Sequence, residues 1–147
     1  MNPTPSPFSR PDAALLALRP AIATEAAPAT AGNSPSVGDF LHLTLRPVLK
    51  LQNDLLLAAV ADFVLDHHIP LAKASLPDQQ RLLAELLARN TKLRYTLVGL
   101  ITGCFTDEEH AFYRQHRSEV KRRLHELALH RVLDQAERVV ALATTTD

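Results

Sequence analysis

Apolar residues recur at seven-residue intervals through the middle of this chain, and this repeat limits the folds that the chain can adopt. Its members fall into two series, which together we call the seam: Leu76, Leu83, Asn90, Leu97 and Cys104, and then Leu86, Leu93 and Leu100. A seam of this kind is typical of a long helix that packs lengthwise against other helices. Leu82, Leu87 and Ile101 flank it and widen the apolar face. The pattern therefore favours the central helix of an intramolecular bundle over a two-stranded coiled coil.

The composition agrees with helices packed on helices. The 147 residues suffice for one domain with a core, Leu and Ala dominate, and aromatic residues are few. The 16 Lys and Arg residues balance 16 Asp and Glu residues, which disfavours a globally basic nucleic-acid binder. No run approaches the roughly 20 apolar residues of a membrane helix, and the first residues make a poor secretory signal. The single cysteine, Cys104, excludes an internal disulfide. We therefore expect a cytoplasmic protein with no membrane association.

Composition also divides the chain into a folded domain and two tails. Residues 1–36 hold most of the prolines and almost no periodic apolar pattern, so the sequence predicts a disordered Pro/Ala-rich tail there. Within it, a brief helical turn over 12–18 is compatible with Pro11 at the first-turn position. Residues 37–143 are predicted to form the helical bundle domain, and residues 144–147 a second tail.

Start and stop signals predict an all-α bundle of three long helices, over 48–67, 76–102 and about 107–142. Pro77 just after Ser75 is a standard helix start, and Gly103 a standard helix end. Thr106 and Glu109 have the spacing of a capping box. The pattern also allows a short fourth helix over 37–46. Pro47 should end or kink it, and the alternating leucines before Pro47 also suit extended backbone.

The last predicted helix changes its apolar face along its length. Its first half carries one stripe, Tyr113, Val120, Leu124 and Leu127, and its second half carries another on nearly the opposite side, Leu129, Val132, Leu133, Ala136, Val139 and Val140. One straight helix on one flat core cannot bury both stripes. Either the helix bends near Ala128, or its second half meets the first helix or a second copy of the protein. In the last case the oligomer face would consist of Leu129, Leu133, Ala136 and Val140.

A basic stripe on the same helix is the candidate ligand site. Its members share one helical face at 100° per residue: His110, Arg114, Arg117, Lys121 and His125. Such a stripe can bind phosphate groups or an acidic partner surface, with Arg giving bidentate contacts. The alternative is an ordinary solvated face.

Two amides form a second candidate pair. Asn90 interrupts the seam, and Asn53 lies along the first long helix. Buried amides must be hydrogen-bonded, so the sequence suggests that these two bond to each other and fix the helix register.

No motif in the sequence indicates catalysis, a cofactor or a metal. There is no Gly-rich phosphate loop, nucleophile elbow, HExxH or paired Glu-x-x-His motif. The sequence therefore favours a non-enzymatic interaction or regulatory module that binds a protein partner or itself. The alternative is a binder of an anionic ligand or nucleic acid through the basic stripe, and a small helical enzyme comes third.

Overall fold

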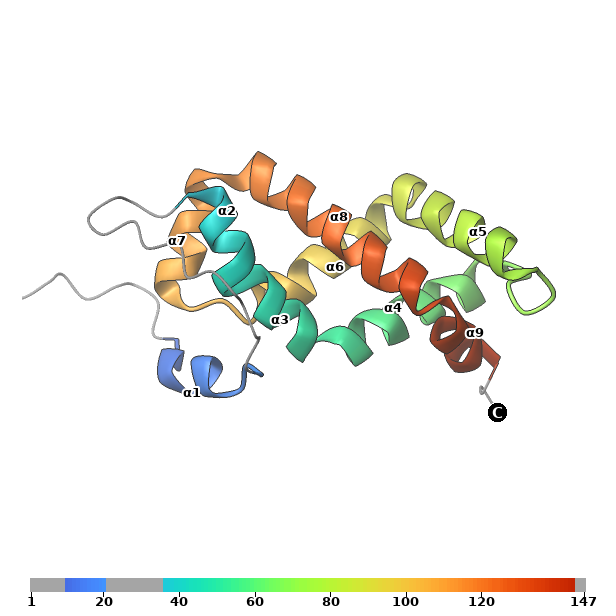
Figure 1. Ribbon diagram of the computed structural model, residues 1–147, viewed down its shortest axis with the longest axis horizontal. Coiled ribbons are helices and arrows are strands. Elements are labelled where there is room, and N and C mark those ends of the chain that lie inside the picture. The colour runs from blue at the N-terminus through green and yellow to red at the C-terminus, as the bar shows by residue number, and fades with distance from the viewer. Residues whose placement is uncertain (1–9, 21–35, 145–147) are drawn as a thin grey trace, which may run out of the picture.

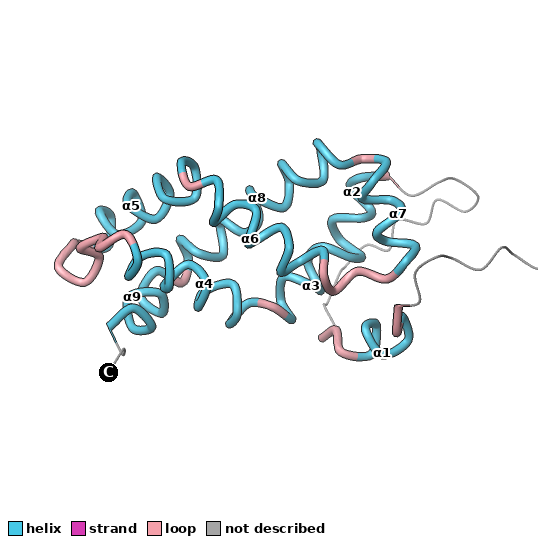
Figure 2. Tube along the Cα trace, turned by 180° about the vertical axis from the view of Figure 1, so that it is seen from behind, coloured by secondary structure: helices cyan, strands magenta, loops and turns pink. Residues whose placement is uncertain are grey.

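The computed structural model describes residues 10–20 and 36–144, and within these ranges every regular element is a helix (Figures 1 and 2). The predicted all-α class is confirmed. In chain order the elements are α1 (Asp12–Ala17), α2 (Val37–Phe40), the π-helical turn η1 (Leu41–Leu45), α3 (Arg46–Leu51), α4 (Asn53–Asp66), α5 (Leu76–Arg89), α6 (Thr91–Thr102), α7 (Asp107–Gln115), α8 (Arg117–Asp134) and α9 (Ala136–Thr144). Buried side chains between Phe40 and Val139 form one core cluster. No helix in the described ranges is long and apolar enough to cross a membrane.

The predicted tails fall largely outside the described residues, which exclude 1–9, 21–35 and 145–147. The helical turn expected over 12–18 is present as α1, with Pro11 directly before it. Its flanking residues Arg10 and Arg19 bond to the body of the protein. Within the predicted tail, residues 10–20 therefore include the short helix that the sequence allowed.

The three long helices are each divided, and the division of the seam helix is the most informative. Asn90 adopts extended backbone angles between α5 and α6, and its side chain accepts a hydrogen bond from the Leu93 N–H at 2.9 Å. Asn90 is thus the N-cap of a new helix, a role that asparagine fills well. Leu83 and Leu97, on either side, are both almost completely buried. The apolar stripe continues across the break because both halves face the same core.

The segment around Pro47 is helical and continuous. Leu45 is fully buried, Leu41 is half-buried and Leu43 is exposed, which is a helical arrangement and not a strand. Pro47 lies in the first turn of α3, directly after the π turn η1. Proline cannot donate a backbone hydrogen bond and crowds the preceding turn. The wider π turn accommodates both effects. Of the two expected outcomes at Pro47, an end of the helix is therefore wrong, because helical geometry continues from η1 into α3.

The last helix changes direction at His116 and Gln135 and not near Ala128. Ala128 is fully buried inside an unbroken α8. After Gln135, α9 packs on α4 and also contacts α5, an arrangement visible from both sides in Figures 1 and 2. The second apolar stripe is therefore buried against helices of the same chain, as one of the expected alternatives had it.

α4 ends in a Schellman motif that has histidine where glycine is usual. The His68 N–H donates to the Leu65 carbonyl at 3.1 Å, and the Ile69 N–H donates to the Val64 carbonyl at 3.0 Å. This pattern requires a left-handed residue, and His68 has a φ of 52°. A residue with a Cβ is strained at that φ, whereas glycine is not.

We therefore expect His68→Gly to stabilise the protein, by up to about 1 kcal/mol, because glycine adopts the left-handed conformation without a Cβ clash. Glycine's greater freedom in the unfolded chain offsets part of the gain. Urea denaturation followed by circular dichroism measures the change in the free energy of unfolding. His68→Ala is the matched control and should give no gain; a loss of stability in His68→Gly would contradict the prediction.

Candidate functional site

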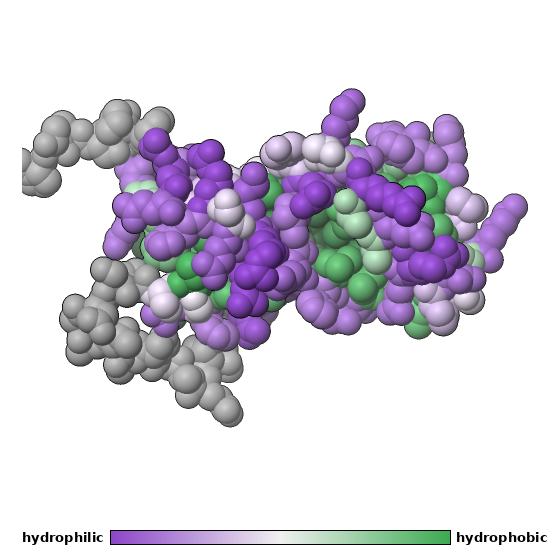
Figure 3. Space-filling model, turned by 90° about the horizontal axis from the view of Figure 1, so that it is seen from above, coloured by the Kyte–Doolittle hydropathy of each residue, from purple (hydrophilic) through white to green (hydrophobic). Residues whose placement is uncertain are grey.

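A groove between α5, α6 and α8 carries several charged groups. Its volume is about 620 Å³. α8 packs against both α5 and α6, so their facing sides border it. The floor is apolar and consists of Ala84, Leu87, Ala88 and Leu129, and the polar lining consists of Arg94, Arg117, Ser118, Lys121, Arg122, His125 and Glu126. On the face drawn in Figure 3, apolar side chains lie in a hollow between hydrophilic ones.

Positive charge at this groove is only partly neutralised. Glu126 is the one carboxylate in the lining, and it pairs with Arg122 at 3.1 Å and with Arg123 at 3.5 Å. Within the described part of the chain, Arg94, Arg117 and Lys121 form no ion pair. Three cations at one groove without acidic partners make a local positive surface on a chain of zero net charge.

Aromatic rings support two of these cations. Lys121 Nζ lies 5.3 Å from the centroid of the Tyr95 ring, and the Arg117 guanidinium carbon lies 5.9 Å from the centroid of the Tyr113 ring. Cation–π contacts of this length hold a cation in place without neutralising it. Tyr113 is buried, which raises the pKa of its hydroxyl although the Arg117 charge opposes the shift. Its ring therefore stays neutral beneath Arg117.

His125 is the neutral member of the cluster. Burial lowers its pKa, and the positive charges of Arg94 and Lys121 lower it further. The imidazole therefore offers one donor and one acceptor at neutral pH. A smaller hollow of about 110 Å³, bordered by Thr91 and Tyr95, joins the groove at Arg94, Lys121 and His125.

The structure brings together three of the five residues of the predicted basic stripe. Arg117, Lys121 and His125 border the groove. Arg114 is exposed on α7, and His110 borders a different hollow near Gly103, because the break at His116 separates α7 from α8.

Sequence reasoning missed Arg94 and Tyr95. Both lie on α6 and are exposed, between the buried seam residues Leu93 and Leu97. The available signal was a cation beside an aromatic residue on the polar side of an apolar helix, which is typical of a contact surface. Their approach to α8 depends on tertiary packing and cannot be read from local spacing.

The two amides expected to pair have different partners. Asn53 and Gln135 exchange two hydrogen bonds, at 2.8 and 2.9 Å, which tie the start of α4 to the break between α8 and α9. The Asn90 side chain lies 3.2 Å from His67 Nε2. His67 Nδ1 is bonded to the Phe63 carbonyl at 3.0 Å, so that nitrogen carries the proton and Nε2 accepts from Asn90. The predicted register pair is therefore wrong, and both amides have structural roles.

The candidate oligomer face is largely covered within the chain. Ala136 is buried, with 1% of its surface exposed, and the other three members, Leu129, Leu133 and Val140, are partly buried against the core. The face change that suggested an oligomer is explained by α9 packing on α4 and α5.

Comparisons of the chain with protein-family models, curated proteins and solved structures gave no match. Among residues 10–20 and 36–144, no group of three or more His, Cys, Asp or Glu side chains is placed to hold a metal ion.

Proposed function

We propose that this protein is a non-enzymatic interaction module that binds an acidic, amphipathic helical segment of a protein partner in the groove between α5, α6 and α8. The observation that carries the proposal is the trio Arg94, Arg117 and Lys121, which border an apolar floor and have no carboxylate partner among the described residues. Acidic side chains of a bound segment would supply the missing charge, and its apolar side chains would cover the floor.

The apolar floor favours a protein segment over a nucleic acid. A phosphate backbone offers charge but no apolar face, whereas an amphipathic helix offers both along neighbouring rows of side chains. Non-specific nucleic-acid binding also draws on an extended basic surface. Here the uncompensated cations gather at one groove on a chain of zero net charge.

The test uses a fluorescent designed peptide of about 14 residues, with leucine at i, i+4, i+7 and i+11 and glutamate at the flanking positions. Fluorescence anisotropy measures its affinity for the full chain. We expect the triple variant R94A/R117A/K121A to bind at least about tenfold more weakly, because three desolvated charge contacts are lost. Affinity should also fall as salt rises.

The matched control K73A/K92A/R114A also removes three positive charges, but from exposed residues that do not border the groove. It should change the affinity by less than about twofold, since charges in solvent are screened. Ala88→Glu places a negative charge at the exposed edge of the floor. This charge repels the glutamates of the peptide, so the variant should bind more weakly, as the triple variant does. Equal losses in both triple variants, or no binding by the wild-type chain, would exclude the groove. Tighter, Arg94-dependent binding of a single-stranded oligonucleotide would replace the proposal with a nucleic-acid site.

A further inference from the structure

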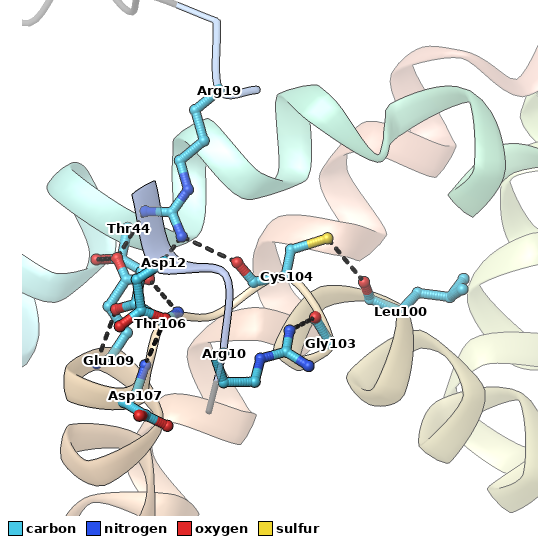
Figure 4. Close-up of polar contacts among 10 residues, drawn as sticks. All are labelled: Arg10, Asp12, Arg19, Thr44, Leu100, Gly103, Cys104, Thr106, Asp107 and Glu109. Carbon is cyan, nitrogen blue, oxygen red and sulfur yellow. Dashed lines mark hydrogen bonds and ion pairs between the residues drawn. The ribbon is translucent and has the colours of Figure 1, made fainter. Parts of the chain in front are cut away.

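The segment Arg10–Pro20, which contains α1, lies at the edge of the molecule against the junction between α6 and α7 (Figures 1 and 4). We call this segment the N-terminal segment and the surface beneath it the junction site. The site consists of Gly103, Cys104, Asp107 and Glu109, together with Thr44. Nothing in the proposed function involves this surface, which lies apart from the groove residues.

The junction site presents two helix ends of opposite polarity, and the N-terminal segment satisfies both. At the end of α6, Arg10 donates to the Gly103 carbonyl and Arg19 Nη2 donates to the Cys104 carbonyl, the latter at 3.0 Å. At the start of α7, the Asp12 carboxylate accepts from the Asp107 N–H at 3.3 Å. Cations suit the carbonyl end of a helix and anions its amide end. The charges of the segment are thus ordered to match the junction.

Arg19 and Glu109 form the centre of the contact (Figure 4). The guanidinium donates to both carboxylate oxygens, at 2.5 and 2.6 Å, and the exposed side-chain fractions are 8% for Arg19 and 14% for Glu109. Thr44 donates a third hydrogen bond to the carboxylate at 2.9 Å, and the Thr106 N–H a fourth. Burial alone would raise the pKa of Glu109, but these donors outweigh it and lower the pKa. The carboxylate is therefore ionised and arranged for a bidentate guanidinium.

Apolar packing contributes little to this contact. No residue of α1 is buried, and Leu16 and Leu18 expose 51% and 63% of their surface. Helical stability in proteins comes mostly from a packed apolar face, which α1 lacks. A short helix held by a few polar contacts opens locally at low cost in free energy compared with the core helices.

We infer that the junction site is a recognition site for an arginine-bearing segment, that the chain's own N-terminal segment occupies it as a separable ligand, and that the N-terminal segment of a second copy can occupy it in trans. The recognised pattern is Arg10, then Asp12, then Arg19. In the single chain the covalent connection favours the internal segment, because its effective concentration reaches the millimolar range. Weakening the internal segment opens the site to an external one.

The first experiment measures binding of a labelled peptide of residues 10–20 to full-length Arg19→Ala by fluorescence anisotropy. This variant keeps Glu109 but loses Arg19, the residue of its own segment that pairs with that carboxylate. It should bind the peptide at least about tenfold more tightly than the wild-type chain does, since the wild-type segment competes. The double variant R19A/E109Q should lose this binding. Glutamine still completes a capping box with Thr106, so the change removes the charge without removing the cap.

Three outcomes would overturn the inference: no binding to Arg19→Ala, equal binding to R19A/E109Q, or equal binding of a peptide with lysine for Arg19, which lacks the bidentate fork. Circular dichroism checks that each variant is folded. If the chain with Glu109→Gln is unfolded, the double variant R19A/T44V replaces R19A/E109Q. It should also bind the peptide more weakly, because it removes a hydrogen-bond donor to the Glu109 carboxylate.

The second experiment tests exchange between copies. Arg19→Ala has an intact site and a defective segment, whereas Glu109→Gln has an intact segment and a defective site. Mixing the two full-length chains should give a heterodimer in sedimentation velocity, while each chain alone stays monomeric at the same concentration. A mixture that remains monomeric would refute exchange in trans. Peptide binding with these same controls is independent of the groove, so its failure is distinguishable from failure of the proposed function.

Discussion

Replacing Phe105 with alanine is expected to lower the free energy of unfolding by about 3–5 kcal/mol, the cost usual for removing a buried aromatic side chain. Phe105 is 1% exposed and lies in the turn between α6 and α7. Its ring meets the Phe40 ring edge-on, with centroids 5.5 Å apart, and the Tyr113 ring at 6.1 Å. Alanine would leave a cavity and break both ring contacts, each worth about 0.5–1.5 kcal/mol beyond area burial. Urea denaturation of the full chain measures the change.

The controls separate the cavity from a general effect of substitution. Phe105→Leu keeps most of the apolar volume and should cost less than about 1.5 kcal/mol. Tyr95→Ala removes an aromatic ring that is 63% exposed and should cost about 1 kcal/mol at most. A loss in Phe105→Ala no larger than that in Tyr95→Ala would show that the turn is not part of the core.

Phe105 also connects the core to the junction site. It directly precedes Thr106, the cap of α7, and the capping box that includes Glu109. The carboxylate that holds Arg19 is therefore positioned by a cap that rests on a buried aromatic residue. Any loosening of Phe105 should weaken the N-terminal segment before it affects the groove, because the residues that line the groove include neither Phe105 nor any residue of the junction site.

Capping chemistry made several helix ends predictable from the sequence. Ser75 caps α5, Gly103 follows α6, and Thr106 with Glu109 forms the predicted box at α7. These signals are local, since each depends on a side chain and on backbone groups within three or four residues. The fold class followed from the same signals and from apolar periodicity.

The breaks inside the long helices were not predictable in the same way. Gln52, His116 and Gln135 leave helical geometry without a Pro, a Gly or a side-chain cap. Gln135 turns where Asn53 bonds to it from another helix, so the direction of α9 depends on tertiary contacts. Tertiary packing overrides local preference at such positions.

The candidate site could be predicted only in part for the same reason. Arg117, Lys121 and His125 share a face of one helix, and their spacing reveals this. Arg94 lies on α6. In that segment the apolar repeat indicated the buried leucines and gave no signal for Arg94. The groove exists because α6 and α8 pack together. The spacing of residues within one helix cannot predict which other helix packs against it.

The seam contains leucines that occupy equivalent positions in the repeat but differ in burial. Leu97 is fully buried, whereas Leu76 at the same repeat position is 47% exposed at the start of α5. Leu97→Ala should lower the free energy of unfolding by about 2–5 kcal/mol. Leu76→Ala should change it by less than about 0.5 kcal/mol, because its side chain is already largely in water. Urea denaturation of both variants gives the comparison.

Asn90→Leu completes the series and decides between a continuous seam and a broken one. In an unbroken helix, replacing a polar residue on the apolar stripe with leucine would add buried apolar surface and raise stability. In this structure Asn90 caps α6 and bonds to His67, so leucine should cost about 0.5–2 kcal/mol. Asn90→Asp keeps a good cap and should stay close to the wild type. A gain of stability in Asn90→Leu would contradict the break and support one continuous helix. A loss in Asn90→Leu, together with a large loss in Leu97→Ala, would support a break at Asn90 with core residues on both sides of it.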